Sequence, residues 1–522
     1  MASDNTITAT LDHVTESIVV DPWESVERVH ADGSVVVNDV HSRLNATTVE
    51  SIVRPRSVEE AVAAVRSAKA RGIPIAIAGA RHAMGGQQFA AGAVLLDMSR
   101  LKRVVDFDES AGSVTVEAGC DWVDLTNHLI EAQKGREAQW SIVQKQTGAD
   151  RLTLGGCVGA NIHGRGLKFR PFVQDIESLT LIDAEGELTT CDRSTNEELF
   201  RLAIGGYGLF GVVCEVKLRL QRRFKVERLA TQVHVGDLIS EIDRHAANGC
   251  EYGDLQMNID DAGEDFLTRG ILSCYRTAPN DTPIPVGQKY IPQAQLERLI
   301  GMAHTDKAAA YRHYSDYYAA SSGQIYWSDT HQFGFYPYGY HAAIDRQAGA
   351  PSEGSEMITE LYVPRAAIAE FMTAVAADLR SNGESIIYST IRFIEVDGET
   401  FLPWAKQRNA CIIFNVHVDH SQAGIERAAG TFRRLIDQAI RLGGSFYLTY
   451  HRFATREQIL ACYPQLPELL RRKLHFDPEE RFQSEWYRHY RGMFADHLQA
   501  GRQLNSGSAS MVRPREPLIR PG

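Results

Sequence analysis

Two glycine-rich stretches of the chain have the composition of an anion-binding backbone. Residues 79–86 read GARHAMGG and residues 153–164 read TLGGCVGANIHG, and we expect each to be a loop that follows a short strand. Because glycine has no side chain, the backbone N–H groups of such loops can approach and surround a pyrophosphate. Glycine-rich stretches also form ordinary turns, so composition alone leaves both interpretations open.

Polar side chains alternate along two predicted strands in the second half of the chain. On 388–395 one face carries Tyr388, Thr390 and Arg392, and on 411–419 one face carries Asn415, His417 and Asp419. Because successive side chains of a strand point to opposite faces, each set gathers on one face of the sheet. A polar face of this kind suits a hydroxylated substrate. The alternative is that it faces solvent.

The same segment does not predict a metal site. His417 and Asp419 share a face of the strand, whereas His420 points to the other side. The eight cysteines are scattered, without CxxC pairs or zinc-ligand spacing. We therefore expect no metal, and we expect buried, reduced thiols of the kind found in the cytoplasm.

A GxGxxG match at residues 206–211, GYGLFG, does not predict a dinucleotide site. The nucleotide-binding form of this motif requires a helix after the glycines. Here the residues of 212–220 alternate between apolar and polar types, which is the period of a half-buried strand.

Helices and short strands alternate through the first half of the chain. Ser57 and Glu60 form a capping box for a helix that ends at Gly72. Strands are predicted at 73–78, 94–97, 104–107, 114–118, 176–183 and 187–191, with a helix from Asp121 to about Lys134. Clear order is expected to begin at Ser51, after a lead-in over residues 1–45.

A change of composition near Arg222 indicates a second domain. Helices are predicted at 423–442 and 455–475, loops at 276–292 and 349–356, and a disordered tail from Asn505. The aromatic segment 311–341 is expected to be either core or a lid over a substrate pocket.

Length and charge limit the classes of protein that the chain can belong to. A chain of 522 residues is long enough for two or three domains. Its formal net charge of -11 argues against nucleic acid as a partner, because neutralising phosphates needs a basic face. We see no signal peptide and no apolar run of about 18 residues, so we expect a cytoplasmic protein without a membrane span.

Five motifs occur in the order typical of one cofactor-binding domain. They are Arg54-Pro55 with Ser57 to Glu60, residues 79–86, Val116 to Gly119, residues 153–164 and Gly208 to Val213. In this order they resemble the FAD-binding domain of the vanillyl-alcohol oxidase/p-cresol methylhydroxylase (PCMH-type) superfamily. The resemblance implies an α+β fold in which FAD lies between two subdomains of that domain.

The second half is more weakly similar to alditol and aldonolactone oxidases and to decaprenylphosphoryl-ribose oxidase. The similarity lies in residues 443–450, Cys462-Tyr463-Pro464 and Asp477-Pro478. It implies a substrate domain in which a large antiparallel sheet, covered by helices, lies over the flavin. The expected organisation is a lead-in at 1–45, the FAD-binding domain at 46–225, the substrate domain at 226–450, a helical segment returning to the FAD-binding domain at 451–500 and a tail at 501–522.

The resemblance assigns FAD to a defined set of residues. They are Ala78, Gly79, Ala80, Arg81, His82, Ala83, Met84, Gly119, Thr147, Gly148, Thr153, Gly156, Asn161, Gly164 and Val213. His82 stands where many members carry an 8α-histidyl bond to the flavin, and a neutral imidazole is a competent nucleophile for that bond. The alternative is a histidine that only hydrogen-bonds phosphate or backbone. Arg151 replaces the cysteine of doubly attached members, so a single attachment is expected.

The implied reaction is hydride transfer from an alcohol carbon to flavin N5, while a base takes the hydroxyl proton. The base is sought among His451, His417 and Tyr450. Arg392 could stabilise a developing alkoxide or bind a carboxylate, and Asn415 shares the polar face. Thr390 replaces the glutamate of the family's Glu-x-Arg motif, and Tyr450 or His451 replaces a lysine, which leaves the substrate open.

The activity that follows is an FAD-dependent oxidase acting on a sugar, polyol or other alcohol, with O2 as acceptor and H2O2 as product. A dehydrogenase of the same fold that uses a quinone or cytochrome is the close alternative. A redox-silent flavin-binding or cyclising protein is the alternative from another class.

Overall fold

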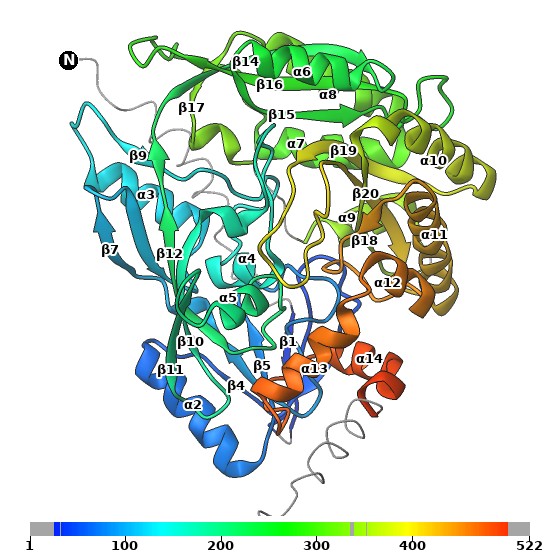
Figure 1. The fold of residues 1–522 in the computed structure, drawn as a ribbon. Coiled ribbons are helices and arrows are strands. Elements are labelled where there is room, and N and C mark those ends of the chain that lie inside the picture. The colour runs from blue at the N-terminus through cyan, green and yellow to red at the C-terminus, as the bar shows by residue number, and fades with distance from the viewer. Residues whose placement is uncertain (1–25, 32, 335–338, 351, 500–522) are drawn as a thin grey trace, which may run out of the picture.

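The computed structural model describes residues 26–31, 33–334, 339–350 and 352–499. Most of the expected lead-in, the expected tail and residues 335–338 of the aromatic segment lie outside these described residues. Five sheets of two to eight strands organise the described part. The smaller sheets lie at the lower left of Figure 1, and the largest sheet lies at its top and right.

Regular structure begins before Ser51, contrary to the sequence-based expectation. Strands β1 (Glu27–Val29), β2 (Val35–Val37) and β3 (Thr47–Val49) form an antiparallel sheet. Val37 and Val49 are fully buried in it. These strands are only three residues long, too short for a clear period in the sequence, and residues 38–46 between β2 and β3 reach the site described below.

A small parallel sheet follows, in the order β4-β6-β5. Its strands are β4 (Ser51–Val53), β5 (Ile75–Ala78) and β6 (Val94–Asp97), and helix α2 (Val58–Arg71) connects β4 to β5. Ser57 caps α2 by accepting the N–H of Glu60, and Gly72 ends it at a φ of 67°. The cap at Ser57 and the stop at Gly72 are as predicted, but the capping box is incomplete, because the Glu60 carboxylate accepts the N–H of Arg56 and not that of Ser57.

Five antiparallel strands in the order β11-β10-β12-β8-β7 form the neighbouring sheet of the described chain. They are β7 (Val104–Asp108), β8 (Ser113–Glu117), β10 (Ile176–Ile182), β11 (Leu188–Asp192) and β12 (Val212–Arg219). Helices α3 (Trp122–Ala132), α4 (Leu154–Ala160) and α5 (Glu197–Ala203) accompany it. In β12 burial alternates residue by residue, which confirms that GYGLFG leads into a strand and not a helix.

One sequence-based expectation needs correction here. Residues 153–164 are not a glycine loop throughout, because α4 occupies Leu154–Ala160. Gly155 lies on this helix where it crosses β8, and a Cβ added at Gly155 would lie 2.9 Å from the Cβ of Ala118. The glycines therefore allow helix and strand to approach closely, which composition alone could not distinguish from a loop.

The second half is built on an antiparallel sheet whose described strands run in the order β17-β14-β16-β15-β19-β20-β18-β21. They are β14 (Lys225–His234), β15 (Cys250–Met257), β16 (Arg269–Ala278), β17 (Ile325–Trp327), β18 (Gly354–Pro364), β19 (Ile386–Ile394), β20 (Asn409–Asp419) and β21 (Ser445–Phe446). Two further residue pairs, β9 (Trp140–Ser141) and β13 (Gln221–Arg222), join each other just before it. A mixed α/β architecture with a large antiparallel sheet is therefore present, as predicted.

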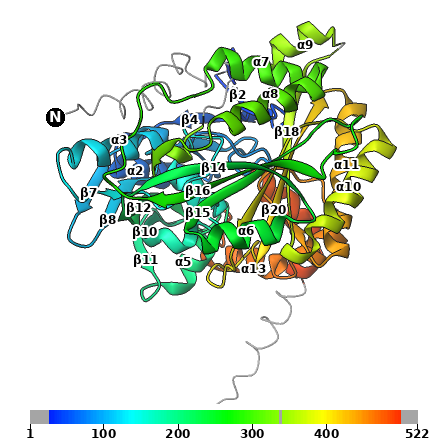
Figure 2. The same cartoon turned by 90° about the horizontal axis from the view of Figure 1, so that it is seen from above.

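Helices cover this sheet. Figure 2 shows α7 (Gln293–Thr305) and α8 (Lys307–Ala320) on one side of β14, β15 and β16, with α6 (Leu238–Ala247) on the other. Helices α9 (His341–Ala348), α10 (Ile368–Asn382) and α11 (Gln422–Arg441) accompany β18 and β20. The buried face of α11 includes Phe432, Leu435, Ile436 and Ala439, spaced as one helical stripe.

The C-terminal segment returns to the parallel sheet of β4, β5 and β6. They are α12 (Arg456–Cys462), α13 (Leu466–Phe476) and α14 (Glu485–Met493), so the helix expected over 455–475 is interrupted near Pro464. The N–H of Ile75 donates to Arg481 O at 2.7 Å, and the N–H of Gln483 donates to Ile75 O at 2.8 Å. The segment after α13 therefore lies beside β5.

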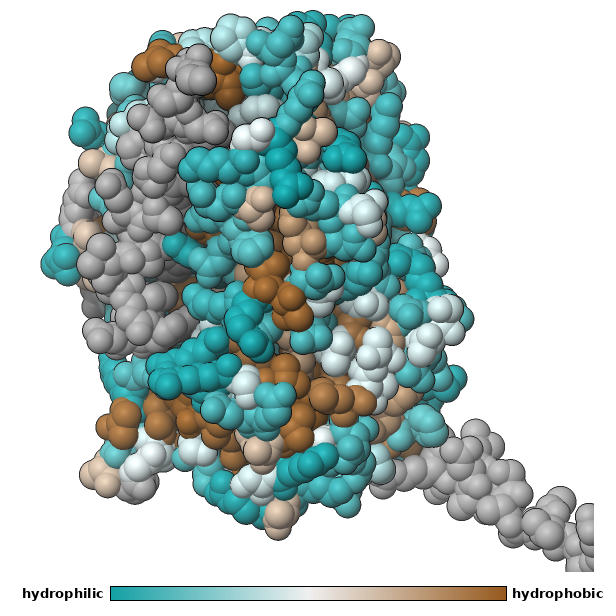
Figure 3. Space-filling view, turned by 90° about the vertical axis from the view of Figure 1, so that its left-hand side faces the viewer, coloured by the Kyte–Doolittle hydropathy of each residue, from teal (hydrophilic) through white to brown (hydrophobic). Residues whose placement is uncertain are grey.

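The cysteines lie inside the molecule, and one face of its surface has a distinct distribution of hydrophobic residues. All eight cysteines lie in the described part of the chain, and all are free and buried. The face on the left of Figure 1 is hydrophilic in its upper part and carries a band of hydrophobic residues lower down (Figure 3). Among the described helices, none is both long and apolar enough to cross a bilayer.

Candidate active site

A cavity of about 1160 Å³ lies between the two halves of the molecule. Its lining combines residues 77–84, 146–149, 207–208 and 210–211 of the first half with residues of β15, β19 and β20 and with Thr449 and Tyr450. Pockets for single small ligands measure about 300–1,000 Å³. The cavity is therefore large enough for an extended ligand and a second, smaller molecule beside it.

The first glycine-rich loop is held in place by polar contacts on several sides. Arg81 has a φ of 55°, in the left-handed region, and its buried side chain pairs with Asp97 at 3.0 Å. Arg81 O accepts the N–H of Val40 at 3.1 Å. Asn45 donates to Met84 O at 2.7 Å, and the N–H of Gly85 donates to Thr449 O at 3.1 Å. A residue outside the favoured backbone regions is kept there only by such surroundings.

The two glycine-rich stretches meet where β5 ends and α4 begins. A Cβ added at Gly79 would overlap Oγ1 of Thr153, the residue that precedes α4. Only glycine allows this approach, so the loop after β5 and the start of α4 form one continuous wall of the cavity. Ala78, Gly79, Thr153 and Gly156 all line that wall.

His82 lines the cavity, and a second histidine lies behind it. His41 Nε2 is 2.6 Å from His82 Nδ1. Burial lowers the pKa of His82 to about 4, and burial together with His82 lowers the pKa of His41 well below its usual value. Both rings are therefore neutral at pH 7, and a neutral ring nitrogen is nucleophilic.

His41 was missed at the sequence level. It follows Asp39, whose carboxylate accepts the N–H groups of His41 and Ser42 at 3.0 and 2.6 Å. An Asp whose carboxylate accepts the N–H groups two and three residues later is typical of a turn. That signal predicts the local shape but does not reveal that the turn faces His82, 41 residues later in the chain.

Most residues expected to contact the cofactor lie in this lining. They are Ala78, Gly79, Ala80, Arg81, His82, Ala83, Met84, Thr147, Gly148, Thr153, Gly156 and Val213. Gly119, Asn161 and Gly164 instead have packing roles in the structure. A Cβ at Gly119 would overlap Met98 O, the Asn161 amide donates to Asp397 at 3.0 Å, and the N–H of Gly164 donates to Gln144 at 3.2 Å.

Three of the expected catalytic residues line the opposite wall: Arg392, Asn415 and Tyr450. Arg392 donates from Nη2 to Thr147 O at 3.3 Å, so it connects the two walls. Within the described residues, Nε and Nη1 of Arg392 and Oδ1 of Asn415 are buried without a hydrogen-bond partner. Buried polar groups are normally satisfied, so these atoms are the ones free to bind a ligand.

Tyr450 is held in its protonated form. Burial, followed by the negative charge of Glu360, raises the pKa of Tyr450 well above its usual value, although Arg392 acts in the opposite direction. Its hydroxyl can therefore donate a hydrogen bond to an oxygen in the cavity. It is not a phenolate base at neutral pH in this environment.

Two expected catalytic histidines lie elsewhere, and these assignments are corrected. His451 is stacked on Phe432 and Phe453, contacts Thr359 Oγ1 at 3.2 Å and has a pKa lowered to about 3 by burial. His417 shares a strand face with Asn415, but its Nδ1 faces Glu356 at 3.2 Å. Neither belongs to the described lining. A strand face is longer than a cavity, so alternation alone did not show where the cavity ends.

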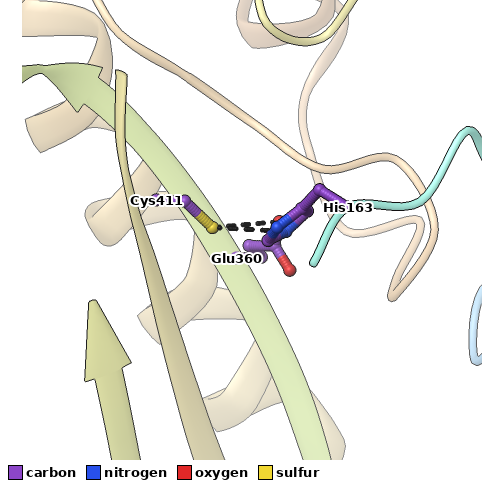
Figure 4. Close-up of side chains that lie close together, drawn as sticks. All are labelled: His163, Glu360 and Cys411. Atoms are coloured by element: carbon purple, nitrogen blue, oxygen red, sulfur yellow. Dashed lines mark hydrogen bonds and ion pairs between the residues drawn. The ribbon is translucent and has the colours of Figure 1, made fainter. Parts of the chain in front are cut away.

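Behind Tyr450 lies a buried cluster of three side chains, His163, Glu360 and Cys411 (Figure 4). His163 Nε2 is 2.9 Å from Glu360 Oε1, and its Nδ1 faces Gly164 O at 2.9 Å. Cys411 donates from Sγ to the same carboxylate oxygen at 3.2 Å. Burial raises the pKa of Glu360, but the charge and hydrogen bond of His163 outweigh it and lower that pKa. The cluster therefore places a negative charge behind Tyr450.

A polar group at the far end of the cavity was also missed. Asp254 and Gln256 project from β15 into the lining, and the Gln256 amide donates to Asp254 at 2.6 Å. Arg165 pairs with Asp254 at 3.4 Å and lies over the ring of Tyr275. Two polar residues at a spacing of two, which is the spacing of one strand face, were a usable signal.

The aromatic segment contributes directly to the cavity. Tyr311, Tyr314, Tyr317 and Tyr318 of α8 and Tyr326 of β17 line it. Residues 335–338 lie outside the described residues. The described part of this segment therefore forms one wall of the cavity.

The comparisons with known proteins agree with this geometry. Residues 49–192 match the family described as FAD binding domain. An uncharacterised oxidoreductase, ORF5 in the fasciation locus of Rhodococcoides fascians, is 31% identical over 192 residues, which are 36% of this chain and 42% of that protein. L-gulonolactone oxidase of Bos taurus is 26% identical over 197 residues, 38% of this chain and 43% of that protein.

L-gulono-1,4-lactone dehydrogenase of Mycobacterium tuberculosis is 28% identical over 193 residues, 37% of this chain and 42% of that protein. In each of these comparisons the chain spans less than half the length of the curated relative it matches. The family match at residues 49–192 covers the part of the chain that carries the glycine-rich wall and His82.

Proposed function

The chain carries an FAD-binding domain of the vanillyl-alcohol oxidase/p-cresol methylhydroxylase superfamily, and we propose that it is an oxidase of hydroxylated small molecules. The observation that supports this proposal is the single cavity that joins the His82 wall to Arg392, Asn415 and Tyr450. A cofactor on one wall and a substrate on the other would lie within reach of each other.

The residues present fit FAD. The glycine approach between β5 and α4 leaves a surface of backbone without side chains, as a pyrophosphate requires. Thr147 Oγ1 is buried in the lining without a hydrogen-bond partner among the described residues. In this proposal FAD lies between a subdomain containing β4, β5 and β6 and another containing the five-stranded sheet. When bound, FAD supplies a two-electron acceptor for hydride.

His82 is proposed to hold the flavin covalently through Nε2. Its Nδ1 lies 2.6 Å from His41 Nε2, so Nε2 is the ring nitrogen on the side away from His41. Burial keeps the ring neutral, because it lowers the pKa of His82 to about 4. The same contact orients the ring, so His41 is a positioning residue in this proposal.

The opposite wall is proposed to bind the substrate oxygen. Tyr450 accepts a hydrogen bond from the substrate hydroxyl and donates its own O–H to Glu360. Arg392 stabilises negative charge on the substrate oxygen through Nε and Nη1. Asn415 Oδ1 accepts from a neighbouring substrate hydroxyl. With His451 and His417 outside the lining, the substrate proton passes to the Tyr450 oxygen while the Tyr450 O–H proton passes to the carboxylate of Glu360.

The electron acceptor distinguishes two versions of the proposal. We favour O2, and a dehydrogenase using a quinone or cytochrome is the second candidate, since both an oxidase and a dehydrogenase occur among the relatives. A redox-silent flavin protein would leave the groups on the opposite wall without a role.

The test is to mix the yellow protein anaerobically with aldonolactones, alditols and aldoses and to follow flavin bleaching. Bleaching that reverses in air with one H2O2 per turnover supports an oxidase. Bleaching that reverses only with an artificial quinone indicates the dehydrogenase. A flavin that photoreduces but is bleached by none of these compounds contradicts the proposal.

A further inference from the structure

A second group of ligand-type side chains lies outside the flavin cavity. It consists of His304 at the end of α7, His417 on β20 and Glu356 on β18. One ligand atom of each lies within 4.8 Å of the others. Three elements far apart in the sequence thus bring two imidazoles and a carboxylate to one point.

The spacing of these atoms suits a common ion. Glu356 Oε1 is 3.1 Å from His304 Nε2 and 3.2 Å from His417 Nδ1. Ligand atoms about 2.1 Å from one ion are about 3.0 Å apart at a right angle and about 3.4 Å apart at the tetrahedral angle. Both observed separations fall between these values.

The orientation of His304 also points to an ion. Although its Nε2 is close to the carboxylate, the angles are not those of a hydrogen bond, and Nε2 has no such partner in the described part of the chain. A ring that only neutralised Glu356 would direct its N–H along the line to the oxygen. Here the nitrogen is beside the carboxylate and not aimed at it, as expected for two ligands that share an ion.

The surroundings supply the second layer of such a site. Tyr340 donates from its hydroxyl to Glu356 Oε2 at 2.6 Å, and His341 Nδ1 contacts the same oxygen. These contacts hold the carboxylate so that Oε1 faces His304 and His417. The Glu356 side chain is only 2% exposed, whereas that of His417 is 30% exposed, so an ion could enter from the His417 side and keep water ligands.

We propose that His304, Glu356 and His417 bind a divalent first-row transition metal ion, with Zn²⁺ as the representative. Two neutral imidazoles and one carboxylate are typical ligands for ions of this class. The inference is independent of the proposed oxidase activity, because none of the three side chains belongs to the described lining of the flavin cavity.

The ion would brace one wall of that cavity. Helix α7 contributes Leu296, Leu299 and Ala303 to the lining, and Ala303 directly precedes His304. A bond from His304 through the ion to β18 and β20 would fix the end of α7 against the sheet. The role is structural, so metal loss is expected to loosen α7 without removing the flavin.

The other buried cluster, His163, Glu360 and Cys411, is a weaker candidate. There the carboxylate oxygen already accepts from His163, Tyr362 and Cys411, and His163 Nδ1 faces Gly164 O (Figure 4). The facing atoms of the three side chains, Glu360 Oε1, His163 Nε2 and Cys411 Sγ, therefore already bond to one another without an ion.

The test is Zn²⁺ binding by the flavin-loaded full chain after treatment with EDTA and desalting. Isothermal titration and elemental analysis are expected to find one Zn²⁺ per chain, and the melting temperature is expected to rise when Zn²⁺ is restored. Cu²⁺ in the same site should give an electron paramagnetic resonance spectrum with nitrogen hyperfine structure. His304→Ala is expected to abolish stoichiometric binding, and His341→Ala to weaken it about 10- to 100-fold.

His313→Ala is the matched control, because His313 is exposed on α8 and is not one of the three clustered side chains. It should bind Zn²⁺ as the wild type does. Glu356→Gln should lose Zn²⁺ binding as His304→Ala does. Circular dichroism and retained flavin colour establish that each variant is folded, and if Glu356→Gln does not fold, His304→Ala alone tests the site. Absence of stoichiometric Zn²⁺ on the wild type, or unchanged binding by His304→Ala, would overturn the proposal.

Discussion

His41 Nε2 lies 2.6 Å from His82 Nδ1, and both residues line the flavin cavity, His41 buried and His82 partly buried. The two residues belong to different sheets, since His41 follows β2 and His82 follows β5. Their contact engages Nδ1 of His82, so Nε2 is the ring nitrogen on the side away from His41. Several measurable consequences of this and related contacts follow.

His82→Ala is expected to abolish covalent attachment of the flavin but to leave its non-covalent binding in place. The backbone wall between β5 and α4 remains, so the variant should still purify yellow. On acid precipitation the colour should move to the supernatant, whereas in the wild type it stays with the pellet. His41→Ala should give a mixture of the two, because the ring of His82 loses its positioning contact.

The pH dependence of attachment provides a separate check. Because the pKa of His82 is lowered to about 4, the ring is neutral at all higher pH values. Attachment of FAD to apoprotein should therefore proceed at similar rates from pH 6 to 8. A rate that falls through a transition near the ordinary histidine pKa of about 6.5 would contradict the buried neutral ring.

His451→Phe is expected to leave turnover within about twofold of wild type, because His451 packs among aromatic rings outside the cavity lining. It should also reduce acid sensitivity. The folded state holds His451 neutral down to about pH 3, while the unfolded chain takes up a proton near pH 6.5. Stability conferred by the neutral ring is therefore lost as pH falls below about 6.5.

Between pH 7 and 5 this linkage amounts to about 2 kcal/mol in the free energy of unfolding. Urea titrations of wild type and His451→Phe at the two pH values measure the difference. An equal loss of stability in both proteins would show that His451 is not the source, and a large loss of turnover would return it to the catalytic residues.

Arg392→Ala is expected to lower kcat/KM about a hundredfold or more, since a buried donor that stabilises developing charge has an effect of that size. Flavin content should not change. Arg276→Ala is the matched control, because Arg276 lies on β16 of the same sheet but pairs with Glu227 at 2.6 Å on the surface. Comparable losses in both variants would argue against a direct role for Arg392.

Tyr450→Phe is expected to lower kcat about a hundredfold while retaining flavin. Because the pKa of Tyr450 is raised well above 10, its ionisation should be absent from the wild-type pH-rate profile below pH 10. A basic limb that disappears in Tyr450→Phe would show that the tyrosine ionises within this range, contrary to its position beside Glu360.

Gly79→Ala tests the wall that joins the two glycine-rich stretches. The added methyl group would overlap Oγ1 of Thr153, and overpacking of this kind costs about 1–3 kcal/mol. Flavin content and melting temperature should both fall. Thr153→Ala in the same chain removes the overlapping oxygen and should restore part of each, whereas Gly398→Ala, at an open position without a left-handed backbone, should leave flavin content unchanged.

Much of the first half could be predicted because its signals are local. The Ser57 cap, the glycine stop at Gly72, strand β6 and the alternation in β12 each depend on neighbouring residues, and the structure agrees with each of them. The FAD-binding domain was predicted from motifs in order, and the family match at residues 49–192 confirms it. Helix α4 was missed because a short glycine-rich helix resembles a loop in composition. The break near Pro464 between α12 and α13 was also missed.

By itself, the sequence determined the α+β composition, the glycine-rich wall, the candidate tether His82 and the polar faces of β19 and β20, because these depend on residue types and on the period of a helix or strand. Only the tertiary structure decided that His41 contacts His82, that Arg392, Asn415 and Tyr450 face one cavity while His417 and His451 do not, and that His304 joins Glu356. Each of these contacts depends on how elements distant in the sequence pack against one another. The spacing of residues along the chain does not determine the distances between such elements.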